Sequence, residues 1–555
     1  MSLPRSGSCA IVGRLPPAAD AGDPDIMDTR RTLGIAALII LFGLLLRTPY
    51  LLHRMQDIDE GSHAAVAAIL MDGGLPYRDA VNNKPPGVWY VYLATFLLFG
   101  KYNMFAVHAV AFFWTLGTAL VLALLAKKLS GRAAALFALL FYLTFTAALY
   151  PKMIAANTEI FMALPYSAAV LLLWYAVERQ RWHLLMLSGC CSGLAFLFKQ
   201  VGGVEAAAVL VFILCIPALS EGRGRIAAAL RASALYGTGF LLPAGAVAAV
   251  FCRLDILDDW VFWNVAYPGR YIRTGFSSLS FSSQILAEFV PFVLSTVILW
   301  VLAGVWTRRV FSGLRSRGRA FAPHFSLFLV LWLAASALVT FAGNRMYGHY
   351  FIQILPPLSL VAALLAGDWV REKQGARRRA WIAAILFLTL VPGAVFTGMA
   401  LPYEAVTETW GELKPDFRPA TDYIRAHTDP GDRIFVWGWF TPFYVYSERT
   451  PATRFVFTTM LTGYRPGDGP GEKDRADITW QLVPESWAML EEDLRRHRPE
   501  LIVDTSPGDY HYFGRYPVGD FPVLSAYIGA NCRLETRIAG AAIYRCGGRP
   551  APGTN

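Results

Sequence analysis

The sequence is short of charged residues and of cysteine. Asp, Glu, Lys and Arg together make up 16% of the 555 residues, whereas about 25% is usual in soluble globular domains. The seven cysteines are scattered, with no CxxC pair and no Cys/His cluster at metal-binding spacing. No internal repeat is visible in the sequence. These deficits argue against an ordinary soluble domain, a zinc-binding module and a repeat architecture.

Hydrophobic residues are abundant instead. They make up 55% of the chain, the mean hydropathy is +0.41, and apolar runs near the spanning length of about 20 residues recur. These features predict a polytopic α-helical membrane protein whose surroundings are a lipid bilayer. The net charge of +10 lies largely in short loops between the runs, so we expect no nucleic-acid partner.

Eleven apolar segments are predicted to cross the membrane and define a domain over residues 33–401. They are 33–52, 104–126, 133–150, 159–177, 183–198, 203–219, 232–251, 285–306, 324–342, 351–370 and 381–401. With a cytoplasmic N-terminus, the basic loops all fall on the cytoplasmic side, as the positive-inside rule requires. Those loops lie near residues 127–132, 179–181, 223–231, 308–319 and 371–379. Eleven crossings place everything after residue 401 outside the cytoplasm.

Two segments around the first span are not predicted to cross. Residues 1–32 are expected to form a disordered cytoplasmic tail, within which Met27 is an alternative start. The apolar stretch 88–100 is short, and a crossing there would move every later basic loop outside. We therefore expect it to lie in or re-enter the outer interface, as part of a catalytic outer loop over residues 53–103.

Residues 402–555 are polar and aromatic, and we expect them to form a small extracytoplasmic α/β domain. Its predicted elements are a strand at 433–438, a helix at 486–496, a strand at 500–504 and a hairpin of 534–538 with 541–544. A tight hairpin turn would place Cys532 opposite Cys546. An exported domain permits a disulfide there, and two free thiols are an equal alternative.

The carboxylate pair Asp59-Glu60 directly follows the first span. Charged groups are costly within a bilayer and gather at its edge or in wet cavities. A carboxylate there could take the proton of an attacking hydroxyl, and two adjacent ones could hold a divalent metal ion. The alternative is that both acids cap the following helix, because negative charge favours a helix N-terminus.

Three more ionisable residues are predicted to lie at the same outer face. Lys84, within Asn83-Lys84-Pro85-Pro86, could contact a lipid phosphate, or could extend its ammonium to the interface as lysines there commonly do. Glu159 opens the fourth span, where it could join Asp59 or simply support a helix cap. Lys199 ends the fifth span, and the same two alternatives as for Lys84 apply to it.

Two later outer loops add basic and aromatic residues. Arg270 follows the seventh span, and Arg345 lies between the ninth and tenth spans. An arginine could bind a phosphate bidentately. His349 and Tyr350 could bind substrate hydroxyls, although an interfacial histidine is often only a hydrogen-bonding residue. We expect all these groups to form one outer-face site for an anionic lipid and a polar second substrate.

As a set, these motifs resemble the C-type glycosyltransferases. They are similar to motifs of the dolichyl-phosphate-mannose protein mannosyltransferase-like group, which is glycosyltransferase family 39, and of its bacterial envelope members. The motifs concerned are the Asp-Glu pair after span one, the Lys-Pro-Pro before an interfacial segment, the acid that opens span four and the lysine that ends span five. The stretch 345–357 also resembles bacterial members. The resemblance covers residues 33–400 and implies the C-type glycosyltransferase fold, with about 11 transmembrane helices, in a plasma (bacterial inner) membrane.

The resemblance also implies a chemistry. A polyprenyl-phosphate sugar would be the donor, and the sugar would pass with inversion to an envelope acceptor (a lipid, glycan or protein). Asp59 would be the catalytic base, supported by Glu60 and Glu159, and Lys84 would contact the donor phosphate. Some relatives carry an acid where this chain has Asn83, so a metal site using that acid does not carry over.

Two other function classes compete with this enzyme. A transporter or flippase of lipid-linked sugars would place paired charges near the bilayer midplane and would show repeat halves. A non-catalytic scaffold would bind an envelope partner through the exported domain and would tolerate loss of Asp59. The clustering of charges at one face favours the enzyme.

Overall fold

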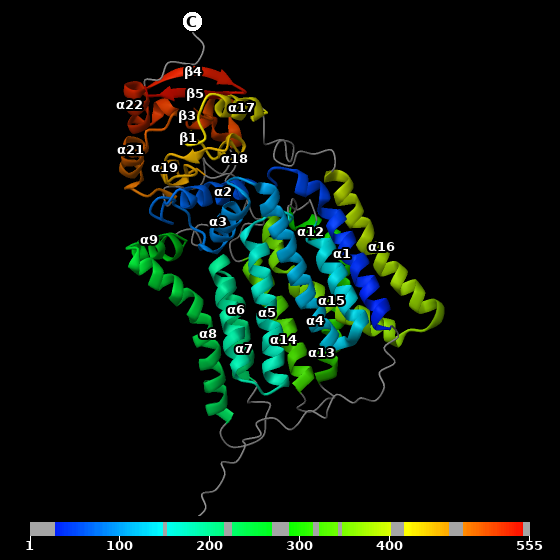
Figure 1. Cartoon of the computed structure of the whole chain (residues 1–555). Helices are drawn as coiled ribbons and strands as arrows, with labels where there is room; N and C mark the ends of the chain where they lie inside the picture. Colours follow the sequence, from blue (N-terminus) through cyan, green and yellow to red (C-terminus); the bar gives the residue numbers. More distant parts are fainter. Residues whose placement is uncertain are drawn as a thin grey trace, which may run out of the picture.

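The computed structural model describes residues 28–147, 153–215, 225–268, 288–314, 321–341, 347–400, 416–464 and 481–547. The chain forms a helical bundle with a small α/β unit at one end (Figure 1). The outer loop lies between these two parts. Arg270 and Arg345 fall outside the described residues, so their predicted roles are not addressed by the structure.

The bundle helices coincide with the predicted apolar segments. They are α1 (Thr29–Leu52), α4 (Met104–Phe145), α5 (Thr158–Glu178), α6 (His183–Phe198), α7 (Gly202–Cys215), α8 (Arg225–Arg253), α12 (Val290–Ser295), α13 (Val297–Leu314), α14 (Phe321–Phe341), α15 (Leu355–Glu372) and α16 (Gly375–Ala400). Within the described ranges, six of them are long and apolar enough to cross a membrane: α1, α4, α5, α8, α14 and α16. The chain is thus a multi-pass membrane protein, and the count of eleven crossings stays a prediction.

Helix α4 consists of two helices that meet at a kink. Its 42 residues cover the segments predicted as the second span and most of the third. Ser130 and Gly131 leave the helical conformation, and Gly131 has a φ of 79°. Glycine adopts this left-handed region without the steric cost that a side chain brings. The two halves of α4 are therefore separate helices on either side of this kink.

The outer loop contributes α2 (Ile58–Met71) and α3 (Gly87–Phe99). Both lie at one end of the bundle, under the α/β unit (Figure 1). Asp57 caps α2, because its side chain accepts a hydrogen bond from the Asp59 backbone N–H. Helix α3 has 13 residues and ends in large exposed apolar side chains, among them Leu98. Thirteen residues are fewer than the roughly 20 that a membrane span needs, and the interfacial position of α3 stays a prediction.

The C-terminal unit contains a five-stranded sheet with the order β2-β1-β3-β5-β4. The strands are β1 (Arg433–Trp437), β2 (Thr450–Pro451), β3 (Leu501–Asp504), β4 (Cys532–Ile538) and β5 (Ala541–Cys546). The helices are α17 (Arg418–Ala426), α18 (Pro442–Ser447), α19 (Thr459–Thr462), α21 (Ser486–His497) and α22 (Pro522–Asn531). Strand β1 runs parallel to β2 and β3, whereas β5 is antiparallel to β3 and β4. The predicted strands, helix and hairpin are present, and Cys532 is disulfide-bonded to Cys546.

The C-terminal unit packs directly on the outer loop. The Val81 N–H donates to the Arg454 carbonyl at 2.8 Å, and the Thr441 hydroxyl donates to the Ile58 carbonyl at 2.8 Å. A Cβ added at Gly61 would collide with the Thr441 hydroxyl. Close contact at the first turn of α2 therefore requires glycine there, and it ties the C-terminal unit to the helix that carries Asp59.

Candidate active site

Asp59 lies at the centre of a cluster of charged side chains at the outer-loop end of the bundle. Its carboxylate oxygen Oδ2 is 3.9 Å from Lys84 Nζ and 3.9 Å from His349 Nε2. Its side chain is 23% exposed, so solvent or a substrate can reach it. The side chain of Asp57 caps the helix and fixes the backbone of this turn. The cap is thus Asp57 and not Asp59 or Glu60, which lie in the first turn of α2, and the outer-face position of Asp59 stays a prediction.

Lys84 is positioned by the backbone before the two prolines. Its N–H donates to the Asn82 side chain at 3.1 Å, and its carbonyl accepts from the Tyr77 hydroxyl at 2.9 Å. Gln200 donates to the carbonyl of Asn83 at 3.0 Å. These contacts fix the backbone on both sides of Lys84 while its ammonium remains 21% exposed beside Asp59. Such a cation is available to an incoming anion.

Glu159 and Lys199 form a buried ion pair beside this pair of residues. The Lys199 ammonium donates to Glu159 Oε1, and it also lies 3.8 Å from the centroid of the Tyr350 ring. The Glu159 side chain is fully buried. Buried charges of this kind persist only when they are paired. The predicted outer positions of Glu159, Lys199 and Tyr350 thus converge on one small region.

His349, in the 3-10 helix η4 (Gly348–Gln353), contacts all three neighbouring carboxylates. Its Nδ1 is 3.6 Å from Asp57 Oδ2, and its Nε2 is 4.0 Å from Glu159 Oε1 in addition to its contact with Asp59. Burial alone would lower the pKa of His349, but the carboxylates of Glu159, Asp57 and Asp59 outweigh it and raise that pKa. The raised pKa favours the protonated form of His349, which would add a third positive group to those of Lys84 and Lys199.

Glu60 faces a different set of partners from Asp59. Its two oxygens accept from the backbone N–H of Gln56 at 2.7 Å and of Ala156 at 2.6 Å. His108 Nε2 lies 3.2 Å from Glu60 Oε2. The Glu60 carboxylate is completely buried and joins the outer loop to the segment before α5. In this arrangement it can brace the helix that carries Asp59.

The described residues contain no group of three or more His, Cys, Asp or Glu side chains arranged to hold a metal ion. The carboxylate of Asp59 faces cations, while that of Glu60 is occupied by backbone N–H groups and His108. Joint ligation of one ion by this pair does not fit these contacts. A divalent ion thus stays a prediction, without a ligand set in the described part of the chain.

Two residues of the site were not singled out from sequence. Asp57 binds Asn157 at 3.4 Å besides capping α2 and facing His349; its place just before a helix beginning with acids is the signal that could have identified it. His63, one turn after Asp59, is buried with neither ring nitrogen hydrogen-bonded in the described structure. Burial lowers the pKa of His63 to about 4. No sequence pattern distinguishes such a histidine from one in the core.

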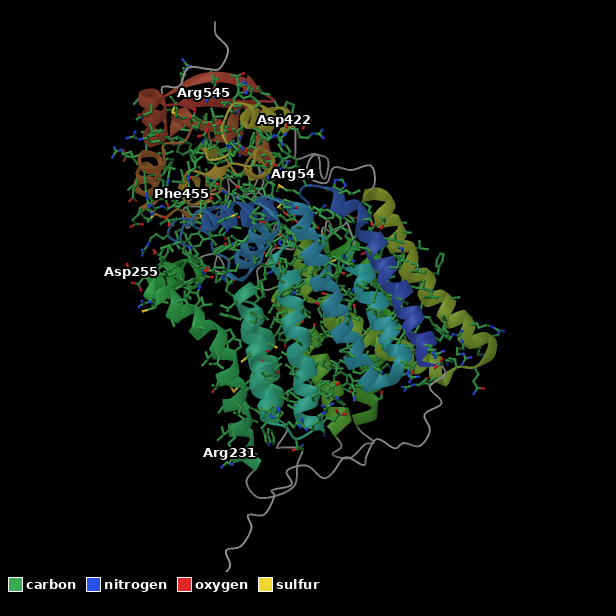
Figure 2. All side chains as sticks on the ribbon, in the orientation of Figure 1. Arg54, Arg231, Asp255, Asp422, Phe455 and Arg545 are labelled. Atoms are coloured by element: carbon green, nitrogen blue, oxygen red, sulfur yellow. A yellow bond between two sulfur atoms is a disulfide. The ribbon has the colours of Figure 1, made fainter. Side chains whose placement is uncertain are left out.

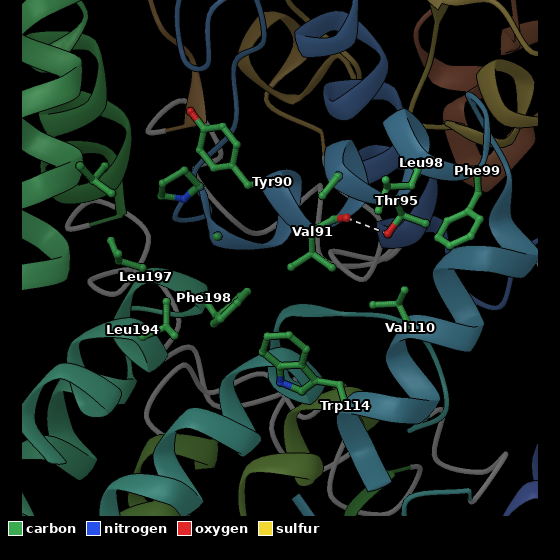
Figure 3. A pocket seen from close by; sticks show the side chains of 14 residues that line it. Tyr90, Val91, Thr95, Leu98, Phe99, Val110, Trp114, Leu194, Leu197 and Phe198 are labelled. Atoms are coloured by element: carbon green, nitrogen blue, oxygen red, sulfur yellow. Dashed lines mark hydrogen bonds between the residues drawn. The ribbon is translucent and has the colours of Figure 1, made fainter. Parts of the chain in front are cut away.

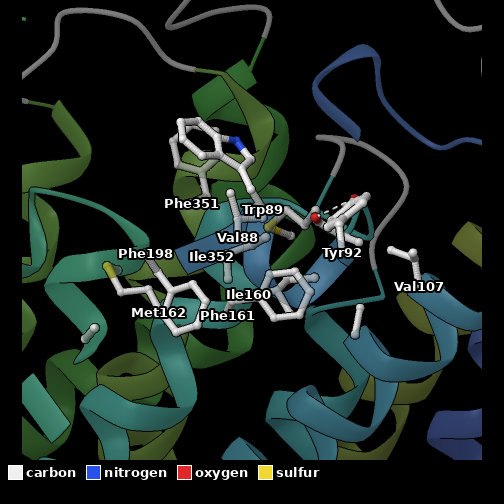
Figure 4. Close-up of a cluster of buried hydrophobic side chains, with 14 of the residues drawn as sticks. Val88, Trp89, Tyr92, Val107, Ile160, Phe161, Met162, Phe198, Phe351 and Ile352 are labelled. Carbon is white, nitrogen blue, oxygen red and sulfur yellow. Dashed lines mark hydrogen bonds between the residues drawn. The ribbon is translucent and has the colours of Figure 1, made fainter. Parts of the chain in front are cut away.

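A continuous apolar core fixes the elements that carry the site. Figure 4 shows Val88, Ile160, Phe198 and Phe351 within one cluster. Val88 follows Lys84 by four positions, and the other three adjoin Glu159, Lys199 and Tyr350 directly. Because protein interiors are close-packed, these neighbours cannot shift independently. The charged cluster is therefore held by rigid elements from five separate parts of the chain.

An apolar cavity of about 500 Å³ begins next to the Lys84 segment. Pro86 and Gly87 line one end, and further walls come from α3, α4, α6 and α8, with side chains such as Tyr90, Trp114 and Leu197. Figure 3 shows Tyr90 and Trp114 on opposite sides of this space. Gly87 is needed here, since a Cβ would lie 2.7 Å from the Leu197 carbonyl oxygen. The cavity can take a hydrocarbon chain but few polar groups.

Comparison with protein families gives a match over part of the chain. Residues 83–238 match the family of dolichyl-phosphate-mannose-protein mannosyltransferases. The matched segment contains Lys84, Glu159 and Lys199, and it confirms the resemblance predicted from the sequence. No curated protein sequence matches the chain.

Solved structures share the fold over nearly the whole chain. ArnT from Cupriavidus metallidurans, bound to undecaprenyl phosphate, has a TM-score of 0.57 and 16% identity, with 92% of this chain and 97% of that chain covered. The apo oligosaccharyltransferase of Archaeoglobus fulgidus has a TM-score of 0.55 and 13% identity, with 95% and 76% covered. AglB from the same archaeon, in complex with an inhibitory peptide and a dolichol-phosphate, has a TM-score of 0.52 and 11% identity, with 93% and 74% covered. The fold is that of C-type glycosyltransferases, as predicted.

Proposed function

We propose that this chain, with its mannosyltransferase-family segment and C-type glycosyltransferase fold, transfers a sugar from a polyprenyl phosphate to an acceptor hydroxyl at the outer face of the membrane. The observation that carries the proposal is the position of Asp59. Its partly exposed carboxylate lies 3.9 Å from both Lys84 and His349. A base beside two cations is what transfer from a phosphate-linked donor needs.

In the proposed reaction Asp59 accepts the proton of the acceptor hydroxyl. The acceptor oxygen forms a bond to the anomeric carbon while the bond from that carbon to the phosphate oxygen breaks. The electron pair leaves with the polyprenyl phosphate, and the sugar is transferred with inversion. Glu60 braces the helix that carries the base, and Glu159 keeps Lys199 in place.

The cations of the site stabilise the leaving phosphate. Lys84 and His349 flank Asp59, and Lys199 lies behind His349, paired with Glu159. Charge-assisted hydrogen bonds to phosphate oxygens strengthen as negative charge develops on the leaving group. Tyr350 and His349 contribute the substrate-facing surface. The predicted phosphate contacts of Arg270 and Arg345 remain part of this proposal.

The apolar cavity is proposed to hold the first part of the polyprenyl chain. Its lining includes Pro86 and Gly87, two and three residues after Lys84. A phosphate at Lys84 would therefore place the attached hydrocarbon next to this cavity. The bound undecaprenyl phosphate of ArnT and dolichol-phosphate of AglB support a lipid of this class.

The C-terminal unit is proposed to be extracytoplasmic and to orient the envelope acceptor. It contacts α2 through Thr441 at the turn that carries Asp59, and its Cys532–Cys546 disulfide is compatible with an oxidising compartment. The transporter alternative is less well supported, because the charged cluster around Asp59 lies at one end of the bundle.

Sugar transfer in membrane vesicles tests the proposal. Vesicles would contain the wild type, Asp59→Asn or Asp422→Asn at equal levels, with a panel of polyprenyl-phosphate sugars and envelope extract as the acceptor source. Removal of a general base typically lowers the rate 10²–10⁴-fold, which is the effect expected for Asp59→Asn. Asp422, which is 63% exposed on α17 and pairs with Arg425 of the same helix, is the matched control and should leave transfer within about twofold.

Equal transfer by the wild type and Asp59→Asn would rule out the base assignment. Movement of intact lipid-linked sugar across the vesicle membrane, with no release of polyprenyl phosphate, would instead support the transporter.

A further inference from the structure

A second, polar cavity of about 250 Å³ lies where three parts of the molecule meet. The outer loop contributes Arg78 and Asp79. Helix α9 (Leu257–Val261) and the following π-helix η2 (Phe262–Ala266) contribute Asp259 and Trp263. Helix α21 of the C-terminal unit closes the third side. Figure 2 shows the tip of α8, with Asp255 labelled, on the same side of the molecule as Phe455 of the C-terminal unit.

The charges in the lining of this cavity are balanced. Arg78 Nε lies 3.2 Å from Asp259 Oδ2, and an Arg496 guanidinium nitrogen lies 3.7 Å from Asp79 Oδ1. Arg454 bonds Glu492 at 2.9 Å. The lining therefore offers three guanidinium groups and three carboxylates. An anion would have to compete with the carboxylates, and a cation with the arginines.

Two of these pairs are weak enough to exchange partners. The Arg496 side chain is 61% exposed and that of Arg78 is 40% exposed. Exposed ion pairs contribute little to stability, at about 0–1 kcal/mol. A ligand that both donates and accepts hydrogen bonds can insert between such partners at small cost.

Hydroxyl groups have this double capacity, because each donates one hydrogen bond and accepts others. Vicinal hydroxyls of a sugar ring match alternating guanidinium and carboxylate groups. Trp263 and Tyr77 also line the cavity, but both side chains are almost fully buried, so recognition of a ring would rest on the charged groups. The volume is slightly below the 300–1,000 Å³ typical of pockets for drug-sized ligands, so it suits one small ring.

The cavity is connected to the charged cluster through its own wall. Tyr77 lines the cavity, and its hydroxyl donates to the Lys84 carbonyl at 2.9 Å. The residues that line the cavity therefore include one that also fixes the backbone of Lys84. The cavity also joins the outer loop to the C-terminal unit, the two parts between which an acceptor would have to enter.

We propose that this cavity binds a neutral sugar ring of a glycan acceptor, through the guanidinium and carboxylate groups of Arg78, Asp259 and Arg496. The assignment rests on the proposed function for its biological role, because it makes the acceptor a glycan. Binding itself needs no transfer, and so it can be tested separately.

The test is binding of the full-length protein in nanodiscs to an array of neutral, phosphorylated and sulfated oligosaccharides. Arg496→Gln and Asp259→Asn each remove one charge-assisted hydrogen bond, and binding of neutral glycans should weaken about tenfold. Arg495→Gln is the matched control, since Arg495 lies on the same helix and pairs with Glu491 away from the cavity. Asp258→Asn, beside Asp259 but outside the lining, is the second control, and both should bind as the wild type does.

The proposal would be overturned if Arg496→Gln and Asp259→Asn bound neutral glycans as tightly as the wild type does. A preference for phosphorylated or sulfated glycans, or no glycan binding at all, would overturn it as well. The thermal unfolding midpoint of each variant, if equal to that of the wild type, shows that the variant is folded. We expect this result for Arg496→Gln, because the Arg496 side chain is largely exposed. The Asp59→Asn protein should bind neutral glycans normally. A wild-type protein that binds neutral glycans but transfers no sugar would count against the proposed function alone.

Discussion

The Lys199 ammonium lies 3.8 Å from the centroid of the Tyr350 ring while it donates to Glu159. One cation is thus held by a carboxylate from α5 and by an aromatic face from η4. Three segments distant in sequence meet at this point. Because a cation above an aromatic ring is attracted to the negative face of that ring, the Tyr350 ring helps to stabilise the buried Lys199 ammonium.

Tyr350→Leu should lower the free energy of unfolding by about 0.5–2 kcal/mol through loss of this cation–π contact. Tyr350→Phe keeps the ring and should preserve most of that energy. Thermal unfolding in detergent would compare the two variants. Equal destabilisation by both would show that the hydroxyl, rather than the ring face, matters.

Glu159→Gln leaves the Lys199 ammonium without its buried counter-charge. Removal of one partner of a buried pair typically costs about 3–5 kcal/mol, whereas replacement of both partners costs less. We expect the double variant Glu159→Gln/Lys199→Met to unfold at a higher temperature than Glu159→Gln alone. The exposed pair Glu491–Arg495 serves as a control, and Glu491→Gln should change the midpoint little. Additive effects of the two buried substitutions would contradict the coupling.

Stability should depend on pH through His349. The folded-state pKa of His349 is raised by Glu159, Asp57 and Asp59 over the opposing effect of burial, so the folded state binds its proton more tightly than the unfolded chain does. The resulting stabilisation is complete below the ordinary histidine pKa of about 6.5, and it is lost as pH rises through the raised value. Thermal midpoints from pH 5.5 to 9.5 should fall in the wild type and fall less in His349→Gln. Parallel profiles for the two proteins would exclude His349 as the titrating group.

Gly61→Ala should loosen the C-terminal unit from α2. The added methyl group would meet the Thr441 hydroxyl and lie 2.7 Å from the Met55 methyl group, and overpacking of this kind costs about 1–3 kcal/mol. We expect faster proteolysis between the two parts and weaker sugar transfer. Gly34→Ala, where nothing lies within 4 Å of the new Cβ, is the control and should leave both unchanged. Identical proteolysis patterns for the two variants would show that the contact is adaptable.

Much of this architecture follows from local patterns in the sequence. Apolar length and basic loops predicted the bundle helices, and the Lys-Pro-Pro motif and the hairpin cysteines lie where the pattern put them. The contacts that Asp59 and Glu60 make could not be predicted from the sequence. Asp59 and Glu60 are adjacent, yet they face opposite surroundings, because tertiary packing decides which first-turn residue meets Gln56, Ala156 and His108. The polar cavity could not be anticipated either, since its walls come from segments more than 170 positions apart, such as Arg78 and Asp259.

The apolar character of the cavity beside Pro86 has a consequence for selectivity among lipids. A polyprenyl chain that enters it leaves bilayer hydrocarbon, not water, so no hydrophobic gain accompanies the transfer. Affinity must then come from the phosphate at Lys84 and its neighbours. The cavity walls around Tyr90 and Trp114 would then select among lipids by shape. They would admit a chain whose branching and unsaturation fit the cavity, and they would exclude a saturated acyl chain of a different shape.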